Sequence, residues 1–332
     1  MSVRAMYEKD ADLSILATKR FAVIGYGNQG HAHALNLRDA GANVIVGQRP
    51  GASFDRAVAD GFAPVDVETA VAQADVIVLG LPDEDIGRVY DRHIASGLRA
   101  GQAIGFVHGF AVRFCLVEAP TGVDVIMVAP KGPGALVRSA FERGGGLTCI
   151  VAVDRDATGR ARDIALAWGA GVGGGKGGMI EATFAQECES DLFGEQTVLC
   201  GGVQELMKMA FELLVEAGVP EELAYFECIH EVKQVVDLQY TDGLAGMRRR
   251  ISNTASYGGL TRGPRIIDDS VRRRMRDALR EIQQGEFARE WIAECEAGKQ
   301  RLASLEAAEA AHPSESAGRA VRSLAAGAIR SL

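Results

Sequence analysis

The sequence predicts an α/β protein with a doubly wound, Rossmann-like N-terminal domain and an all-helical C-terminal domain. Up to about residue 154, short β-branched runs alternate with helical patterns. These runs are continuously apolar, which is typical of strands covered by helices on both faces of a parallel sheet. From about residue 183, long helical patterns replace the strands, after a glycine-rich stretch at 169–178. We therefore expect two domains, 1–182 and 183–332, with a ligand at the carboxyl ends of the strands.

The same patterns place the individual elements along the chain. Strands are predicted at 21–25, 43–47, 75–79, 103–107, 124–128 and 147–153. Helices are predicted in the first domain at 28–40 and 53–60. The second domain is predicted to hold helices at 185–217, 220–240, 268–284 and 286–308, with a final helix and a loose tail within 303–332.

Composition excludes several classes of protein. The 332 residues suffice for two domains, and the 47% hydrophobic and 24% charged fractions are those of a globular protein. The net charge of −8 comes without the concentrated basic surface that nucleic-acid binding needs. The chain has no apolar segment of about 18 residues, no C-x-x-C pair and no apolar signal segment near residue 1. We expect a cytoplasmic protein with free thiols that binds neither nucleic acid nor membrane.

A dinucleotide-binding motif directly follows the first predicted strand. Residues 25–30 read G-Y-G-N-Q-G, which matches G-x-G-x-x-G between a strand and a helix. Glycines at these places permit a tight turn, close approach of backbone N–H groups to a pyrophosphate, and close packing of helix on sheet. The predicted cofactor contacts of this segment are Gly25, Tyr26, Gly27, Asn28, Gln29 and Gly30.

The end of the second predicted strand distinguishes between the two nicotinamide cofactors. NAD enzymes usually carry Asp or Glu there to hold the ribose 2′-hydroxyl, whereas residues 46–53 read V-G-Q-R-P-G-A-S. Arg49 offers a guanidinium and Ser53 a hydroxyl at a helix N-terminus, and both suit a 2′-phosphate. This favours NADPH over NADH, the alternative being a solvated arginine and an ordinary helix-capping serine.

Two pairs of carboxylates stand one helical turn apart in the second domain. They are Asp191 with Glu195 and Glu227 with Glu231, flanked by apolar residues and with no cation four residues onward. Carboxylates on a largely buried face repel one another unless a cation lies between them. Four hard oxygen donors without a matching set of Cys and His ligands favour Mg²⁺, and two ions could be bridged by substrate oxygens. The alternative is an acidic surface exposed to solvent.

Two residues of the first domain stand at predicted strand ends. His108 follows the strand at 103–107, and Lys131 follows the strand at 124–128 in a Pro/Gly-rich loop. A lysine in a rigid loop at this edge suits an electrostatic role toward an anionic substrate. A structural histidine and a surface lysine are the alternatives.

Five motifs together resemble the ketol-acid reductoisomerase family. They lie at 24–35 (I-G-Y-G-N-Q-G-H-A-H-A-L), 128–134 (V-A-P-K-G-P-G), 191–196 (D-L-F-G-E-Q), 224–231 (A-Y-F-E-C-I-H-E) and 251–255 (I-S-N-T-A). The similarity runs from Tyr7 to His312, and the length is similar to the short class of the family.

The resemblance implies a reaction shared by valine and isoleucine biosynthesis. A 2-aceto-2-hydroxy acid such as 2-acetolactate or 2-aceto-2-hydroxybutyrate undergoes a Mg²⁺-dependent alkyl shift, and NADPH reduces the product to a 2,3-dihydroxy acid. By motif position, Asp191 would bridge two Mg²⁺ ions that Glu195 and Glu231 complete. In the second domain, the resemblance implies that Glu227 contacts the substrate and the metal shell, and that Ser252 binds the substrate carboxylate. In the first domain, it implies catalysis for His108 and support of the metal site for Lys131. It also implies cofactor contact for Asp83 and Gly134. A homodimer or larger homo-oligomer is also implied, since helices of a second subunit close the site in this family.

Some positions depart from the family pattern, and three other functions stay open. The loop around Ser53 is one residue short and poorer in serine, Ala111 replaces a polar residue, and the loop at 83–86 lacks a glutamine. These departures permit a paralogue that acts on a related 2-keto acid. A metal-free β-hydroxyacid dehydrogenase with Lys131 as acid/base would leave the four carboxylates unexplained. A non-catalytic NADP-binding protein would have no reason to keep them.

Overall fold

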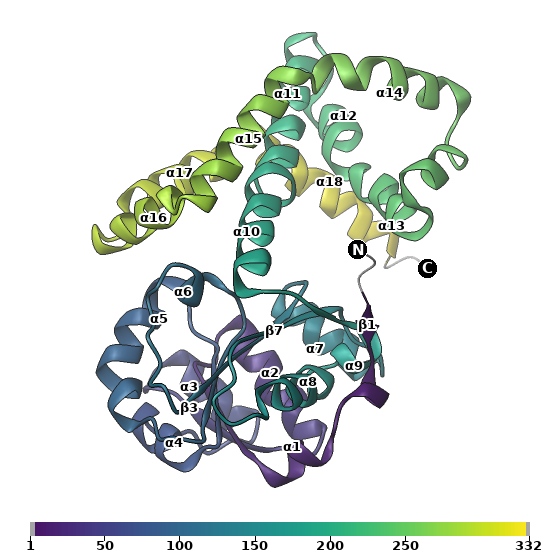
Figure 1. Cartoon of the computed structure of the whole chain (residues 1–332). Helices are drawn as coiled ribbons and strands as arrows, with labels where there is room; N and C mark the ends of the chain where they lie inside the picture. Colours follow the sequence, from purple (N-terminus) through teal and green to yellow (C-terminus); the bar gives the residue numbers. More distant parts are fainter. Residues whose placement is uncertain (1–3, 330–332) are drawn as a thin grey trace. The chain divides into compact units, whose positions relative to one another are not determined.

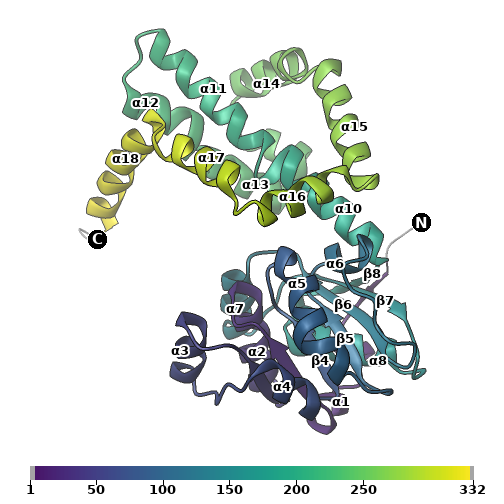
Figure 2. The ribbon, with the colours of Figure 1, turned by 90° about the vertical axis from the view of Figure 1, so that its left-hand side faces the viewer.

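The computed structural model describes residues 4–329, with side chains up to Ser323. The chain divides into two compact units, one ending at Ser190 and one beginning at Asp191, and each is described by itself. The first unit is a sheet with helices on both faces (Figure 1). The second consists of helices, which Figure 2 shows from another side. The predicted α/β class with a helical C-terminal part is confirmed.

One eight-stranded sheet forms the centre of the first unit, in the order β1-β8-β7-β6-β5-β4-β2-β3. The strands β3, β2, β4, β5 and β6 are parallel neighbours, so their carboxyl ends share one edge. All six predicted strands are present. The strand bounds are β1 Ala5–Met6, β2 Arg20–Ile24, β3 Asn43–Gly47, β4 Val76–Leu79, β5 Ala103–Phe106, β6 Asp124–Pro130, β7 Cys149–Arg155 and β8 Met179–Glu181.

The prediction of a wholly parallel sheet is wrong at one side. Strand β7 runs antiparallel to β6, and two short strands that the sequence did not predict, β8 and β1, extend the sheet beyond it. A continuous apolar run shows that both faces of a strand are buried, but it does not show the direction of the strand. The glycine-rich stretch 169–178 belongs to this unit, where it ends α8, forms α9 and leads into β8.

The helices of the first unit cover both faces of the sheet and create two hydrophobic cores. Alternate residues of β2 enter different cores, with Phe21 and Val23 in one and Ala22 and Ile24 in the other. This period of two explains why the strand is apolar throughout. The helices are α1 Ser14–Thr18, α2 Asn28–Asp39, α3 Ala52–Ala59, α4 Val67–Gln73, α5 Asp83–Val89, α6 Phe110–Arg113, α7 Gly134–Glu142, α8 Ala161–Gly171 and α9 Gly174–Gly177, with single turns η1 Glu8–Asp10, η2 Tyr90–Ile94 and η3 Ala95–Gly97.

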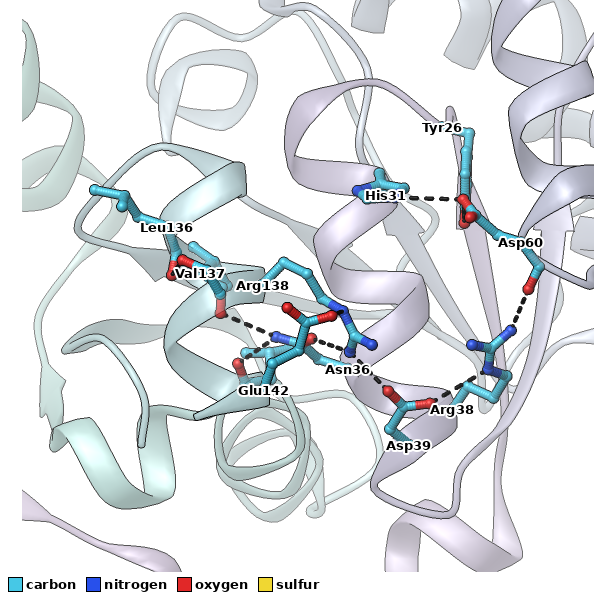
Figure 3. A network of polar contacts seen from close by, with 12 residues as sticks. Tyr26, His31, Asn36, Arg38, Asp39, Asp60, Leu136, Val137, Arg138 and Glu142 are labelled. Carbon is cyan, nitrogen blue, oxygen red and sulfur yellow. Dashed lines mark hydrogen bonds and ion pairs between the residues drawn. The ribbon is translucent and has the colours of Figure 1, made fainter. Parts of the chain in front are cut away.

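A polar network joins α7 to α2 (Figure 3). The Arg138 guanidinium donates to Asn36 Oδ1 at 2.9 Å and pairs with Asp39 at 2.7 Å and Glu142 at 3.0 Å. The Asn36 amide donates in turn to the carbonyl oxygen of Val172 at 3.0 Å. Because α7 follows the Lys131 loop directly, this network fixes one end of that loop against α2.

The helices that follow are shorter than the sequence predicted. Glycines and π-helical turns interrupt the predicted helices at 185–217 and 220–240, and Gly298 with Lys299 divides 286–308, both residues having positive φ. Helix α14 was missed because Gly258, Gly263 and an internal proline lower its helix propensity. The bounds are α10 Phe184–Gly194, η4 Glu195–Leu199, α11 Gly202–Glu216, α12 Glu221–Tyr225, η5 Phe226–His230, α13 Val232–Arg248, α14 Asn253–Ile266, α15 Asp269–Gln283, α16 Glu286–Glu296, α17 Gln300–Ala310 and α18 Pro313–Ile329.

Within residues 4–329, no helix has the length and apolar character needed to span a lipid bilayer. The last part of the predicted tail, residues 330–332, lies outside the described residues.

Candidate functional site

The turn between β2 and α2 has the geometry of a phosphate cradle. Gly25 has φ +90°, and a Cβ added to Gly30 would lie 2.1 Å from the carbonyl oxygen of Gly25. Only glycines fit this turn, since side chains at these positions would be strained or would overlap the backbone. Gly27 caps α2, and the first N–H groups of a helix have no intrahelical acceptor. This cradle fits a pyrophosphate.

A cavity of about 650 Å³ opens beside this turn. Of the predicted cofactor residues, Gly25, Tyr26, Gly27, Arg49 and Ser53 line it. Sequence reasoning missed two further segments that line the cavity. One leads into α4, and the other leads from β4 into α5. Their lining residues include Pro64, Val65, Asp66, Val67, Glu68, Leu81, Pro82, Asp85 and Arg88.

Other predicted cofactor residues lie beside this cavity without lining it. Asn28, Gln29 and Gly30 form the first turn of α2, where Gln29 Nε2 donates to the carbonyl oxygen of Gly132 at 3.0 Å. Gly134 packs against that turn so closely that a Cβ there would lie 2.1 Å from the carbonyl oxygen of Asn28. Asp83 is the first residue of α5, and its negative charge is among the causes that raise the pKa of His108.

The end of β3 carries no acidic residue. Arg49 is exposed and Ser53 half-buried in the first turn of α3, while Gln48 Oε1 accepts from the backbone N–H of Tyr26 at 2.9 Å. The acidic residues on the opposite wall have partners of their own. Asp66 caps α4 by accepting from Thr69 N at 2.7 Å, and Glu68 lies 2.5 Å from His93 Nδ1.

A buried carboxylate joins the two strand-end residues that the sequence singled out. Glu187 Oε2 lies 3.0 Å from His108 Nδ1 and accepts from the backbone N–H of Gly109 at 2.9 Å. Its other oxygen accepts from Lys131 Nζ at 3.1 Å. The Glu187 side chain is 1% exposed, so the carboxylate that joins the cluster is shielded from water, whereas the Lys131 side chain is 35% exposed. Because His108 follows β5 and Lys131 follows β6, the cluster lies at the same sheet edge as the glycine turn.

The cluster favours a protonated histidine beside an ionised carboxylate. Burial opposes the charge on His108, but hydrogen bonds with Cys188 and Glu187 and the negative charges of Glu187 and Asp83 raise its pKa well above the ordinary value. Burial likewise opposes ionisation of Glu187. The His108 bond and charge, the Lys131 charge and the Gly109 N–H outweigh it and lower the pKa of this carboxyl.

Sequence reasoning missed Glu187, although a signal for it exists. It stands four residues before Asp191, so the spacing of the first acid pair extends one turn further back along α10. A Cβ on Gly109 would lie 2.6 Å from the carbonyl oxygen of Phe184, so the glycine lets α10 approach the His108 loop.

The structure does not gather the two predicted metal-binding pairs. Within the described residues, no three of Asp191, Glu195, Glu227 and Glu231 lie within ligand distance of one another. Asp191 is half-buried and the other three are exposed. The expectation that each pair occupies a largely buried face is therefore wrong for the single chain.

Both acid pairs border π-helical turns. Glu195 begins η4, where its carbonyl oxygen accepts from Cys200 N at 2.9 Å, and Glu227 lies within η5. Such turns are frequent at functional sites because the extra residue redirects the side chains around it. Ser252 caps α14, with its Oγ accepting from Ala255 N at 3.1 Å.

Comparison with known proteins identifies the family of this chain. Residues 15–178 match the family described as acetohydroxy acid isomeroreductase, NADPH-binding domain, and residues 184–326 match the ketol-acid reductoisomerase C-terminal domain. A solved NADH-preferring ketol-acid reductoisomerase from an uncultured archean is 43% identical, with a TM-score of 0.94 over 97% of this chain and 99% of that one. The chain belongs to the ketol-acid reductoisomerase family. This reductoisomerase is therefore an oxidoreductase/isomerase enzyme with an NAD(P)-binding N-terminal domain, as the motifs predicted.

Two more distant structures share the fold alone. A semialdehyde dehydrogenase NAD-binding protein from Cupriavidus necator is 18% identical, with a TM-score of 0.63 over 80% of this chain and 98% of that one. A pyrroline carboxylate reductase from Plasmodium falciparum is 13% identical, with a TM-score of 0.50 over 81% and 98%. These two likenesses concern the fold and carry no statement about activity.

Proposed function

We propose that this reductoisomerase converts 2-acetolactate and 2-aceto-2-hydroxybutyrate into 2,3-dihydroxy-3-methyl acids of valine and isoleucine biosynthesis. The observation that carries the proposal is the buried Glu187, which holds His108 and Lys131 together at the sheet edge where the dinucleotide cradle lies. Residues 1–182 would bind the cofactor, and 183–332 the metal ions and substrate. We propose a cytoplasmic location, which the six free thiols support.

NADPH is the proposed cofactor, and it supplies a hydride when bound. The cradle accounts for Gly25, Gly27 and Gly30, whose lack of side chains lets a pyrophosphate approach the turn. The Gly25 N–H donates to the carbonyl oxygen of Gly47 at 3.0 Å, so the donors to the pyrophosphate are the N–H groups at the start of α2. Arg49 and Ser53, beside the same cavity, would hold the 2′-phosphate. Because a 43%-identical relative prefers NADH, Michaelis constants for NADPH and NADH are the direct test, and a clear NADH preference contradicts this assignment.

Asp191, Glu195, Glu227 and Glu231 are the proposed ligands of two Mg²⁺ ions, which polarise the substrate oxygens when bound. The donor set fits, because carboxylate oxygens near water suit a hard cation that keeps part of its hydration shell. Since no three of them meet within one chain, we propose that the metal sites require a second copy, in a homodimer or a larger homo-oligomer.

The chain's own residues would bind and orient the substrate around these groups. Lys131 and protonated His108 place two positive charges at the sheet edge, where they stabilise negative charge that develops on substrate oxygens. Glu187 keeps both side chains in place. Ser252, at the N-terminus of α14, would donate to the substrate carboxylate, aided by the helix dipole.

Replacing Asp191 tests the metal assignment. NADPH oxidation with 2-acetolactate and Mg²⁺ should be abolished by EDTA and restored by added Mg²⁺, and Asp191→Asn should reduce it to background. NADPH binding, measured by fluorescence titration, should stay unchanged, because the dinucleotide cradle is formed by residues near Gly25.

The matched control is Asp269→Asn, which removes an exposed carboxylate from α15 and should leave turnover intact. If Asp191→Asn retains turnover with Mg²⁺ present, the two-metal assignment is wrong. Turnover of the parent enzyme that survives EDTA would favour the metal-free dehydrogenase.

A further inference from the structure

An arginine of α3 is bound to the backbone of the dinucleotide turn. The Arg56 Nη2 group donates to the carbonyl oxygen of Tyr26 at 2.9 Å and to that of Gly27 at 3.2 Å. The guanidinium also lies over the Tyr26 ring, 5.6 Å from its centroid. One side chain thus contacts two consecutive peptide groups of the turn.

The bond to Tyr26 sets the direction of the peptide group between Tyr26 and Gly27. The bond to Gly27 reinforces the first hydrogen bond of α2, in which the Gly27 carbonyl oxygen accepts from the backbone N–H of His31 at 3.0 Å. In a trans peptide, the N–H of each residue points opposite to the carbonyl of the residue before it. Carbonyls of Tyr26 and Gly27 that face Arg56 therefore direct the N–H groups of Gly27 and Asn28 away from it. The N–H of Tyr26 is already taken by Gln48. Gly27 and Asn28 are thus the donors that this part of the turn offers to a phosphate.

Asp60, which directly follows α3, contacts one residue in the turn and one residue of α2 behind it. Asp60 Oδ2 accepts from the Tyr26 hydroxyl at 2.9 Å and lies 3.3 Å from His31 Nε2 (Figure 3). Burial, followed by the Asp60 contact, raises the pKa of Tyr26, so its hydroxyl stays a donor. Arg38 donates to the Asp60 carbonyl oxygen at 2.6 Å and thereby restrains Asp60 from α2.

We propose that Arg56 and Asp60 are positioning residues that orient the dinucleotide turn toward the pyrophosphate common to NADPH and NADH. The proposal rests on the dinucleotide binding proposed above. Arg56 stands three residues after Ser53 on the same helix, a position from which a second 2′-phosphate contact would be expected. Its guanidinium instead faces Tyr26 and Gly27, so its effect falls on the half of the cofactor that both nucleotides share.

Dissociation constants of both cofactors test the assignment in the full-length protein. Arg56→Met should weaken NADPH and NADH alike, on the order of tenfold each, leaving their ratio within about twofold. Arg56→Lys should recover most of the affinity, because an ammonium can still donate to the two carbonyls. Asp60→Asn should weaken both cofactors by a smaller factor, since its amide oxygen still accepts one of the two contacts.

Two further variants provide the comparison. Arg49→Ala should weaken NADPH and leave NADH nearly unchanged, and Val58→Ala, at an exposed position of α3, should change neither constant. Loss of NADPH affinity alone in Arg56→Met would make Arg56 a selectivity residue and overturn the proposal. Unchanged constants with a lower unfolding temperature would show a merely structural role and overturn it as well. If the parent protein binds neither nucleotide, dinucleotide binding itself fails.

Discussion

At the scale of single residues, His33 shows how burial links this fold to pH. Its side chain is fully buried beside Trp168, whose Nε1 donates to His33 Nδ1 at 3.1 Å. Nδ1 therefore accepts and Nε2 carries the hydrogen, although within the described residues no partner is found for Nε2. Burial lowers the pKa of His33 to about 3, so the folded protein keeps this imidazole neutral well below pH 6.

We predict that His33→Asn makes the protein less sensitive to acid. Below about pH 6.5 the unfolded chain binds a proton at His33 that the folded chain does not. The free energy of unfolding therefore falls by roughly 1.4 kcal/mol per pH unit until the folded pKa is reached. Asparagine retains an oxygen near the place of Nδ1 for Trp168. Urea unfolding at pH 7 and pH 5 should show about 2 kcal/mol less loss in the variant.

The control is His93→Asn, which changes a partly exposed imidazole paired with Glu68 and should leave the pH dependence of unfolding nearly unchanged. An equal acid slope in His33→Asn and the parent would contradict the prediction.

Sequence analysis singled out His108 and Lys131 at predicted strand ends, yet it missed Glu187, which contacts both side chains. The two cationic residues stand at strand ends, which the pattern of apolar runs reveals. Glu187 lies 79 residues from His108 and 56 from Lys131 along the chain, so its burial depends on how α10 packs against two strand ends. Spacing within one helix cannot show such long-range burial, although Glu187 continues the four-residue spacing of Asp191 and Glu195.

At the scale of elements, sequence patterns predicted the type of element better than its direction or its irregularities. Each predicted strand was found, but the antiparallel β7 was not foreseen, since burial on both faces is the same in either direction. The π-helical turns η4 and η5 were also missed, because their apolar spacing differs from that of an α-helix by a single residue. These irregular turns lie at the proposed metal ligands, Glu195 in η4 and Glu227 in η5.

The close contact of α7 with α2 leads to a prediction for Gly134→Ala. A methyl group there would lie 2.1 Å from the carbonyl oxygen of Asn28, so α7 must move away from the first turn of α2. We expect the free energy of unfolding to fall by about 1–3 kcal/mol and NADPH to bind more weakly. Urea unfolding and fluorescence titration measure the two effects.

Gly145→Ala is the matched control, since its methyl group would lie 3.5 Å from the carbonyl oxygen of Ala140, an ordinary contact. If the Gly134 and Gly145 variants behave alike, the packing of α7 on α2 does not support the dinucleotide turn.

At the scale of the whole molecule, the second unit leaves many apolar side chains in water. One of its buried clusters consists of Phe211, Ala224, Tyr225, Ala317 and Val321. In contrast, Tyr240 is 92% exposed, Leu244 72% and Leu199 68%. Large apolar side chains this exposed mark an interaction site where they adjoin one another. The apolar residues flanking the acid pairs led us to expect buried carboxylates, but a sequence pattern cannot show whether the same chain or another copy covers them.

Assembly of copies through this apolar surface predicts that Tyr240→Glu with Leu244→Glu produces a smaller, inactive particle. The parent protein should elute as a dimer or larger assembly in size-exclusion chromatography with light scattering. The double variant should have the mass of one chain, because charged side chains oppose burial in an interface. Its turnover of 2-acetolactate should be lost, since one chain does not gather the proposed Mg²⁺ ligands, while NADPH binding persists. Val58→Glu, which adds the same charge on α3, should leave both mass and turnover unchanged. A parent protein that is monomeric and fully active would show instead that one chain completes the metal site, by a rearrangement of the helices that carry the two acid pairs.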